Sequence, residues 1–417
     1  MSCCRDRYDY VIAGNGAAGA AAVEGIRSVD GEGSILVISG EKHPVYGRPL
    51  ISYLLEGKTD EARMYYRESG FYEKNRCEVL YGETALAVDP EKKLVTLSGG
   101  GSAGYGSLCV AAGSSPFVPP FKGLETVRNR FSFMTLDDAL ALSKVLSKDK
   151  KVLIMGAGLI GLKCAEGILR RVGSVTVADL APRILPAILD SECAGIVQKH
   201  IEKENVSFIL GDTAEYFEDG RAFMKSGRTV DFDILVIAVG VRANVSLVKD
   251  AGGEVNRGIV VDTHMRTSIP GIYAAGDCAE CLDVSSGDRR VMAIMPNACI
   301  GGFAAGVNMA GGCKTFADAI PMNSAGFFGL HVMTAGTCEG ECESFYGEDG
   351  GLNRLYVKDG LLKGFIFIGK PERTGVYTYL IRERVPLESI DIELFKKTAT
   401  QAMFGKKERG RRFGGVV

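Results

Sequence analysis

The stretch Val152-Leu153-Ile154-Met155-Gly156-Ala157-Gly158-Leu159-Ile160-Gly161 is a short apolar run that ends in the pattern G-x-G-x-x-G. Residues 10–19 repeat the arrangement, with Gly14, Gly16 and Gly19 as the three glycines. Each copy predicts a buried strand, a tight turn and a helix start. The second glycine lets the backbone approach a pyrophosphate, whose charge the helix N-terminus attracts. Two copies therefore predict two dinucleotide sites.

The composition is that of a globular protein without a strong electric field. Its 417 residues suggest two or three domains, and a formal charge of −2 gives no field to attract nucleic acid or an anionic membrane. No apolar run is long enough for a membrane span or a signal peptide, so we expect a cytoplasmic protein whose twelve cysteines are mostly reduced. No cysteine or histidine spacing is typical of a metal site, and no metal is predicted.

Each motif is followed by segments that predict the rest of a nucleotide site. After the first motif a strand at 34–38 leads to Glu41, the candidate acid for ribose hydroxyls. Residues 78–89 and 93–97 alternate like strands, and residues 98–106 are predicted to be a glycine-rich turn between hairpin arms. Residues 137–148 predict an amphipathic helix that precedes the second motif.

The second motif has its own candidate acid. A strand at 174–179 ends in Asp179, at about the spacing of twenty residues from Gly156 that a ribose-binding acid has. A carboxylate there accepts hydrogen bonds from a free 2′-hydroxyl and repels a 2′-phosphate. NADH is therefore favoured over NADPH. Arg183, a few residues further on, is the one feature that argues for NADPH, because an arginine can bind the 2′-phosphate.

Three further segments resemble a known family. Residues 44–53, Pro-Val-Tyr-Gly-Arg-Pro-Leu-Ile-Ser-Tyr, resemble the P-Y-x-R-P-x-L-S segment of flavin-dependent reductases with rubredoxin, ferredoxin or nitrite-reductase partners. Residues 267–278 match T-S-x-P-x-I-Y-A-A-G-D, and residues 107–116 are similar to A-T-G-S-x-P, with Ala112 in place of threonine. The chain thus resembles the FAD- and NAD-dependent pyridine nucleotide-disulfide oxidoreductases, closest to the rubredoxin-reductase and nitrite-reductase flavoprotein branch.

The resemblance implies an α/β fold with two Rossmann-like domains. One binds FAD and the other, inserted into it, binds NAD(H); a small α+β domain follows. The expected boundaries are 1–118 and 244–315 for the FAD domain, 119–243 for the NAD domain, and 316–417 for the C-terminal domain. That last domain is expected to form an interface with another protein or with a second copy of the chain, so a homo-oligomer is one of the possible assemblies.

The resemblance also implies which residues bind the two cofactors. For FAD they are Gly14, Gly16, Ala17, Ala18, Gly19, Glu41, Lys42, Arg48, Pro49, Thr84, Ala85, Ala111, Gly113, Gly276, Asp277 and Pro296. For NAD(H) they are Gly156, Gly158, Leu159, Ile160, Gly161, Asp179 and Gly240. Pro296 begins a helix whose positive N-terminal end would stabilise a reduced, anionic flavin.

Two departures from the family narrow the chemistry. Glu56 stands where NADH oxidases and coenzyme A disulfide reductases have their redox cysteine, which disfavours disulfide and sulfenate mechanisms. Ferredoxin-reductase relatives pair a lysine with a glutamate at positions that here hold Tyr53 and Lys163. Lys163 is the candidate group that tunes flavin or nicotinamide, or it is a solvated helix lysine. Cys278 and Cys281 form a C-x-x-C that is either a redox pair or, preferably, packing.

These observations predict an FAD-dependent NADH:acceptor oxidoreductase. Hydride would pass between NADH and FAD, and electrons would pass to or from an iron–sulfur or rubredoxin-type partner, with no nucleic acid or membrane involved. The partner is either transient or permanent. In the permanent case the chain is the flavin subunit of an iron–sulfur complex, such as a 2-oxoacid:acceptor oxidoreductase. The same motifs are also compatible with an NADH oxidase and with a non-catalytic nucleotide-binding scaffold.

Overall fold

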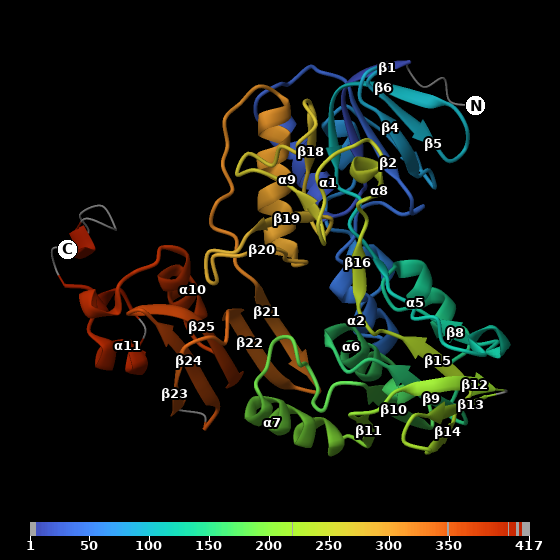
Figure 1. The fold of residues 1–417 in the computed structure, drawn as a ribbon, viewed down its shortest axis with the longest axis vertical. Helices are drawn as coiled ribbons and strands as arrows, with labels where there is room; N and C mark the ends of the chain where they lie inside the picture. The colour runs from blue at the N-terminus through green and yellow to red at the C-terminus, as the bar shows by residue number, and fades with distance from the viewer. Residues whose placement is uncertain (1–5, 219, 348–349, 399, 406–407, 411–417) are drawn as a thin grey trace. The chain divides into compact units, whose positions relative to one another are not determined.

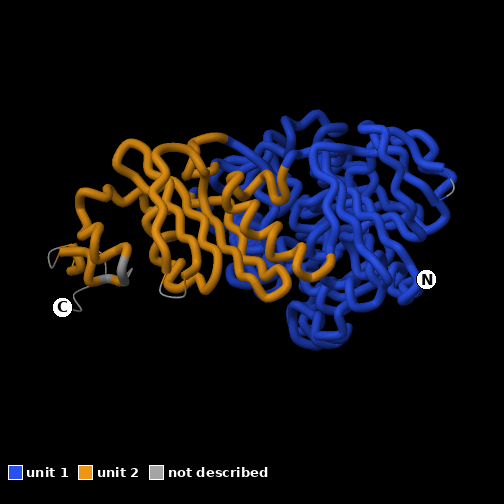
Figure 2. The backbone as a smooth tube through the Cα atoms, turned by 90° about the horizontal axis from the view of Figure 1, so that it is seen from below, with its two compact units in different colours: residues 1–182, 206–282, 289–317 blue, residues 183–205, 283–288, 318–417 orange. Residues whose placement is uncertain are grey.

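The computed structural model describes residues 6–218, 220–347, 350–398, 400–405 and 408–410. The chain divides into two compact units, coloured separately in Figure 2. The first unit comprises residues 1–182, 206–282 and 289–317, and the second comprises residues 183–205, 283–288 and 318–417.

A seven-stranded sheet contains the first glycine motif. Its order is β3-β2-β1-β6-β5-β4, and β18 pairs with β6. The strands are β1 (Arg7–Ala13), β2 (Ile35–Ser39), β3 (Cys77–Tyr81), β4 (Ala85–Asp89), β5 (Leu94–Leu97), β6 (Ser102–Val110) and β18 (Ile272–Ala274). β18 pairs in parallel with β6, although residues 111–271 separate the two strands in the sequence. The chain therefore leaves this sheet after β6 and returns to it at β18.

The turn predicted at 98–106 is wrong in its second half, because β6 already begins at Ser102. The glycines of that half, Gly104 and Gly106, allow a close approach of strands. A Cβ at Gly106 would lie 2.6 Å from the carbonyl oxygen of Asp9, and one at Gly104 would lie 3.0 Å from that of Asp6. Glycine here lets two parallel strands pack together and does not mark a turn.

A second sheet contains the second glycine motif, in the order β11-β10-β9-β15-β8, with every pair parallel. Its strands are β8 (Arg130–Phe131), β9 (Lys151–Met155), β10 (Ser174–Asp179), β11 (Val206–Leu210) and β15 (Ile234–Ile237). The continuous apolar runs of β9 and β15 are buried, as strands covered on both faces require. A small sheet of β12 (Ala214–Glu218), β13 (Arg221–Met224) and β14 (Thr229–Asp231) contributes Phe217 to the same core.

An antiparallel ribbon joins the segments of the two sheets. It consists of β7 (Ser114–Pro116) and β16 (Val241–Ala243), with Ser115 opposite Arg242. The Arg242 guanidinium lies 4.0 Å from the centroid of the Phe117 ring. The ribbon therefore marks both crossings between the first sheet and the inserted second sheet.

Helices of the first unit cover these sheets. They are α1 (Ala17–Arg27), η1 (Arg48–Leu50), α2 (Ile51–Glu56), α3 (Glu61–Met64), α4 (Phe71–Lys74), η2 (Leu124–Thr126), α5 (Leu136–Ser143), α6 (Leu159–Ile168), η3 (Leu169–Arg171), α8 (Ser246–Lys249) and α9 (Met295–Met309). The helix predicted at 137–148 is thus shorter than expected. A further small sheet is formed by β17 (Ile259–Val260), β19 (Ala279–Leu282) and β20 (Arg289–Val291).

Helices α1 and α9 lie side by side (Figure 1) and pack at backbone distance. A Cβ at Gly302 would lie 2.2 Å from the carbonyl oxygen of Ala18, and one at Gly306 would lie 2.1 Å from that of Ala22. Small residues on both helices are therefore required for this contact. None of the described helices is long and apolar enough to cross a membrane.

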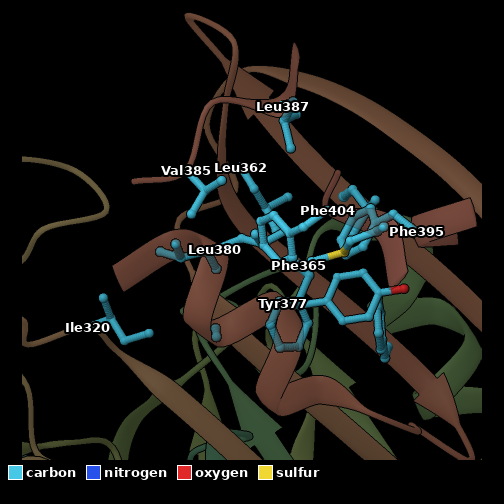
Figure 3. Packing of buried hydrophobic residues seen from close by; sticks show 14 residues of the cluster. Ile320, Leu362, Phe365, Tyr377, Leu380, Val385, Leu387, Phe395 and Phe404 are labelled. Carbon is cyan, nitrogen blue, oxygen red and sulfur yellow. The ribbon is translucent and has the colours of Figure 1, made fainter. Parts of the chain in front are cut away.

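The second unit is built on an antiparallel sheet in the order β21-β22-β25-β24-β23. Its elements are α7 (Ser191–Glu202), β21 (Met322–Phe327), β22 (Leu330–Gly336), β23 (Glu341–Tyr346), β24 (Leu352–Lys358), β25 (Leu361–Gly369), α10 (Thr374–Arg382), η4 (Leu387–Ser389), α11 (Ile392–Thr398) and η5 (Gln401–Met403). Phe365, Tyr377 and Phe395 are central to its core (Figure 3). Two Rossmann-like sheets and this α+β segment confirm the predicted α/β fold class.

Candidate active site

The first glycines of the two motifs have the same geometry. Gly14 has φ +122°, and a Cβ on it would lie 2.0 Å from the carbonyl oxygen of Ala111. Gly156 has φ +114°, and a Cβ on it would lie 2.2 Å from the carbonyl oxygen of Ala238. Each turn therefore requires glycine for two reasons. Its φ is positive, and a Cβ would clash with the facing carbonyl oxygen.

The third glycines close each loop onto its own helix. A Cβ at Gly19 would lie 2.1 Å from the carbonyl oxygen of Gly14, and one at Gly161 would lie 1.9 Å from that of Gly156. The helix thus packs on the strand that precedes it, as a dinucleotide-binding turn requires. Ala17 and Ala18 begin α1, and Leu159 and Ile160 begin α6, so all four lie where the sequence predicted.

The second glycines face open space. A Cβ at Gly16 or Gly158 would meet no atom within 4 Å. Both residues are N-caps, and neither α1 nor α6 has a side-chain cap or an acid in its first turn. Helix α5, by contrast, has the hydroxyl of Thr135 as a cap. Open space in front of uncapped N–H groups fits a diphosphate at each loop.

Asn15 adds a donor to the first loop that the motif alone did not predict. Its Oδ1 accepts a hydrogen bond from the Tyr72 hydroxyl at 2.5 Å. Its Nδ2 is buried and has no hydrogen-bond partner within the described part of the chain. A buried donor of this kind is expected to meet a ligand or water, which also fits a diphosphate here.

Asp179 lies at the second loop, as predicted. Its Oδ2 accepts a hydrogen bond from the Ala157 N–H at 2.6 Å, and its Oδ1 accepts one from the Ala181 N–H at 2.8 Å. In the first sheet Ser39 ends the corresponding strand, with its hydroxyl donated to the carbonyl oxygen of Glu41. The candidate acid of the first site, Glu41, therefore lies two residues beyond the end of its strand.

Glu41 is held by two neighbours. Its Oε1 pairs with Arg48 Nη2 at 2.5 Å, and its Oε2 accepts a hydrogen bond from the Tyr46 hydroxyl at 2.6 Å. Arg48 also donates to the carbonyl oxygen of Met134 at 3.1 Å. Burial raises the pKa of Tyr46 above its usual range, so the phenol stays protonated and donates. Tyr46 was not predicted as a site residue, although it lies inside the 44–53 segment.

The neighbouring FAD candidates Lys42, Thr84 and Ala85 gather beside Glu41. The Gly82 N–H donates to the carbonyl oxygen of Glu41 at 3.3 Å. A Cβ at Gly40 would lie 3.3 Å from Thr84 Oγ1. Ala85 begins β4 directly after Thr84. The turn after β2 and the turn before β4 therefore meet, which brings these candidates together.

Asp277 and Gly276 lie against the first loop. A Cβ at Gly276 would lie 2.9 Å from the Cβ of Ala18. Burial raises the pKa of Asp277, and the charge of Arg48 opposes that rise. Arg48, which begins η1 and precedes Pro49, thus interacts electrostatically with Asp277, which lies far away in the sequence.

The remaining cofactor candidates lie at strand and helix ends. Ala111 follows β6, and its N–H donates to the carbonyl oxygen of Ala13 at 2.8 Å. Gly113 and Gly240, each with positive φ, flank the β7–β16 ribbon. Pro296 lies in the first turn of α9, which has neither a side-chain cap nor an acid in that turn.

Tyr53 and Lys163 contact each other across α2 and α6. The Lys163 ammonium lies 4.8 Å from the centroid of the Tyr53 ring and forms an ion pair with Glu166. Lys58 lies 5.8 Å from the same ring and pairs with Glu56 Oε1 at 2.6 Å. Glu166 was not predicted, although its spacing of three residues from Lys163 on a helix is a detectable signal.

The C-x-x-C motif does not have the properties of a redox pair. Cys278 donates its thiol hydrogen to the carbonyl oxygens of Val110 and Ala275. Burial raises the pKa of Cys278 to about 11 and that of Cys281 to about 12, so both remain thiols at neutral pH. Among the described residues, no group of three or more His, Cys, Asp or Glu is placed to hold a metal ion.

Known proteins are similar to this chain over most of its length. It is 30% identical over 390 residues to the NADH-dependent phenylglyoxylate dehydrogenase subunit epsilon of Aromatoleum evansii, covering 91% of this chain and 92% of that one. It is 35% identical over 314 residues to an NADH oxidase of Methanocaldococcus jannaschii, covering 72% of this chain and 70% of that one. Other relatives are named as reductases of rubredoxin and ferredoxin.

The solved structure of a putidaredoxin reductase–putidaredoxin complex matches with a TM-score of 0.86 at 23% identity, over 95% of this chain and 97% of that chain, and shows the shared fold. The family described as pyridine nucleotide-disulphide oxidoreductase matches residues 8–302. Its members are flavoprotein oxidoreductases that use FAD and NAD(H). This chain belongs to the pyridine nucleotide-disulphide oxidoreductase family and is an FAD-dependent enzyme that uses NAD(H).

Proposed function

We propose that this enzyme transfers hydride between NADH and FAD and exchanges electrons with an iron–sulfur or rubredoxin-type protein. The observation that carries the proposal is the contact of Tyr53 with Lys163. Tyr53 lies on α2, directly after Arg48 and Pro49 of the FAD side, and Lys163 lies two residues beyond the last glycine of the NAD loop. The contact joins the two segments that are proposed to bind the nucleotides, and hydride transfer requires such segments to meet.

The chain's own residues divide the work in this proposal. Bound FAD supplies the redox chemistry, as an acceptor of hydride and a donor of single electrons. The loops at Gly16 and Gly158 bind the two diphosphates, and Asp179 binds the ribose of NADH. Arg48 and Asp277 hold the flavin side, and Lys163, against Tyr53, sets the charge at the contact. Each of these roles is a proposal that rests on the geometry above.

A second candidate makes the electron partner permanent. The match to the epsilon subunit extends over nine-tenths of both chains and therefore includes most of residues 318–417, which the family match at 8–302 does not reach. Phenylglyoxylate is a 2-oxoacid. We therefore favour a flavin subunit of an iron–sulfur oxidoreductase complex, of the 2-oxoacid:acceptor type, over a freely diffusing reductase.

Glu56 argues against an oxidase that works through a cysteine. Its carboxylate occupies the position where the oxidase branch has a thiol, and a carboxylate forms no sulfenate. Because the chain is similar to an NADH oxidase, oxygen is also tested as the electron acceptor. A scaffold that binds both nucleotides and transfers no electrons is the remaining alternative.

Anaerobic mixing of the purified protein with NADH tests the proposal. We expect the yellow flavin to bleach, and an iron–sulfur acceptor to restore the colour. Flavin that stays oxidised would instead support the scaffold. Rapid oxygen consumption without a partner would support the oxidase. Affinity purification from the native host tests the second candidate, because cluster-bearing subunits would co-purify with a permanent subunit.

We also propose the domain boundaries 118/119, 243/244 and 315/316. The β7–β16 ribbon supports the first two, because it joins residues 114–116 to 241–243. The free thiols of all ten described cysteines support the proposed cytoplasmic location. Light scattering of the purified protein tests the homo-oligomer that the C-terminal segment leaves open.

A further inference from the structure

The carboxylate of Glu56 is buried and only half satisfied. Its side chain is 8% exposed, and its Oε1 lies 2.6 Å from Lys58 Nζ. Its Oε2 is buried, with no hydrogen-bond partner in the described part of the chain. A buried carboxylate oxygen without a donor is costly, so it is expected to meet a proton, water or a ligand.

Glu56 belongs to a cluster of four charged groups around one ring. The Lys58 and Lys163 ammonium groups lie 5.8 and 4.8 Å from the Tyr53 ring centroid, and each lysine is paired with a glutamate, Glu56 and Glu166 respectively. Two positive and two negative charges sum to zero. The loss of one carboxylate would therefore leave a net positive charge in the cluster.

The cluster lies between the two nucleotide segments. Helix α2 follows η1, which holds Arg48, and α6 starts at the NAD loop. The two helices pack closely, because a Cβ at Gly167 would lie 2.8 Å from the carbonyl oxygen of Ser52. The ring of Tyr53 and its lysines are thus placed where both cofactors are proposed to meet.

Exposure rises along the cluster toward water. The Glu166 and Glu56 side chains are 8% exposed and Lys163 is 19% exposed, whereas Lys58 is 57% exposed. A proton on Glu56 is therefore one ion pair away from solvent. No other exit needs to be invoked.

The proposed reaction requires such an exit, so this inference rests on the proposed function. One NADH and two one-electron acceptors give NAD⁺, two reduced acceptors and one proton. Two electrons leave with the acceptors, and the hydrogen that arrived as hydride is left behind as a proton when its bond to the flavin breaks. A positioned base that accepts it is general base catalysis.

We propose that Glu56 accepts this proton on Oε2 and releases it to water at the exposed end of its ion pair with Lys58. The new O–H bond on Oε2 breaks when the proton reaches solvent. Lys58 holds Oε1 and keeps the carboxylate in place between turnovers. When electrons flow the other way, the same route supplies the proton.

Proton release during one reoxidation tests the proposal. The FAD-loaded protein is reduced with one equivalent of NADH without oxygen and mixed with ferricyanide in weakly buffered solution that contains a pH indicator. We expect Glu56→Gln to slow proton release and reoxidation by about 10- to 100-fold. Glu56→Asp should restore part of the rate, and Glu61→Gln, on exposed α3, serves as the matched control and should behave as the native protein.

The flavin midpoint potential gives a readout that does not depend on turnover. Glu56→Gln leaves one uncompensated positive charge in the cluster, which stabilises the reduced, anionic cofactor, so the potential should rise. Thermal unfolding of each variant shows that it is folded. If Glu56→Gln changes neither proton release nor potential, the Glu56 proposal is wrong while the proposed function stands. If the native protein binds no flavin or is not reduced by NADH, the proposed function itself fails.

Discussion

The carboxylate of Asp179 accepts a hydrogen bond from the backbone N–H of Ala157, with 2.6 Å between Oδ2 and N. The acid that ends β10 thus holds the loop in which Ala157 lies between Gly156 and Gly158. The Asp179 side chain therefore holds the shape of the loop, and it is also the candidate ligand for a ribose. This relationship gives the first prediction.

We expect Asp179→Ala to weaken NADH binding by about tenfold or more, because hydrogen bonds of a carboxylate contribute about 1.5–3 kcal/mol each. The affinity for NADPH should fall less, because Asp179→Ala also removes the repulsion between the carboxylate and the 2′-phosphate. Titration of nicotinamide fluorescence measures both dissociation constants. Asp149→Ala, at an exposed site of the same unit, is the control. An unchanged NADH-to-NADPH ratio would exclude Asp179 as the specificity residue.

Gly158→Ala and Gly161→Ala form a matched pair on the NAD loop. A Cβ at Gly158 would meet no atom within 4 Å, so the unfolding free energy of Gly158→Ala should stay within about 0.5 kcal/mol of the native value. Its NADH affinity should nevertheless fall about tenfold or more, because the methyl group occupies the space of the pyrophosphate. Gly161→Ala should lose about 2 kcal/mol or more of stability, since its Cβ would lie 1.9 Å from a carbonyl oxygen. Urea unfolding measures the stability of each variant, and NADH titration measures its affinity. If the native protein and Gly158→Ala bound NADH equally well, this loop would not be the diphosphate site.

Acid should destabilise the second unit through Asp190. Burial raises the pKa of this carboxyl, but hydrogen bonds from Tyr356, the Cys193 N–H and Arg354 outweigh it and lower the pKa to about 2. A folded-state pKa below the unfolded value adds stability above about pH 4, which is lost as the pH falls toward 2. The loss should be about 2 kcal/mol.

The Asp190 prediction is measured by urea unfolding between pH 2 and 5. Asp190→Asn should be less stable than the native protein at pH 5 and should show a weaker dependence on acid. Asp212, in the first unit, also accepts hydrogen bonds that lower its pKa, so Asp212→Asn controls for acid effects elsewhere. Equal acid sensitivity of native and Asp190→Asn protein would contradict the assignment.

Alkylation should separate buried from exposed cysteines. At pH 7 a thiol with a pKa of about 11 is ionised in about one molecule in 10⁴, so Cys278 should react far more slowly than a free cysteine. Cys313, Cys338 and Cys342 are exposed and should react first. Mass spectrometry of the labelled peptides measures the order. Fast labelling of Cys278, or a disulfide between Cys278 and Cys281, would restore the redox-pair interpretation.

Local patterns were sufficient to predict several parts of the fold. The positions of Gly14, Gly156 and Asp179 follow from short-range rules: an apolar run buried on both faces, a turn that only glycine can make, and an acid at a fixed distance along the chain. The insertion of one sheet into the other followed from the order of the motifs. The turn predicted at 98–106 failed in its second half because glycine is common both in turns and between closely packed strands, and only β1, from elsewhere in the chain, decides between them.

The sequence by itself determined the family, the two Rossmann-like sheets and the two glycine loops, because each depends on neighbouring residues and a regular period. Only the tertiary structure decided the environment of the charged side chains. It brought the Tyr53 ring within 4.8 Å of the Lys163 ammonium on another helix, and it left one oxygen of Glu56 buried with no donor among the described residues. The burial of these groups and the contact between α2 and α6 arise from segments that are distant in sequence, and electrostatic energies depend on distances in space and on how much water the fold excludes.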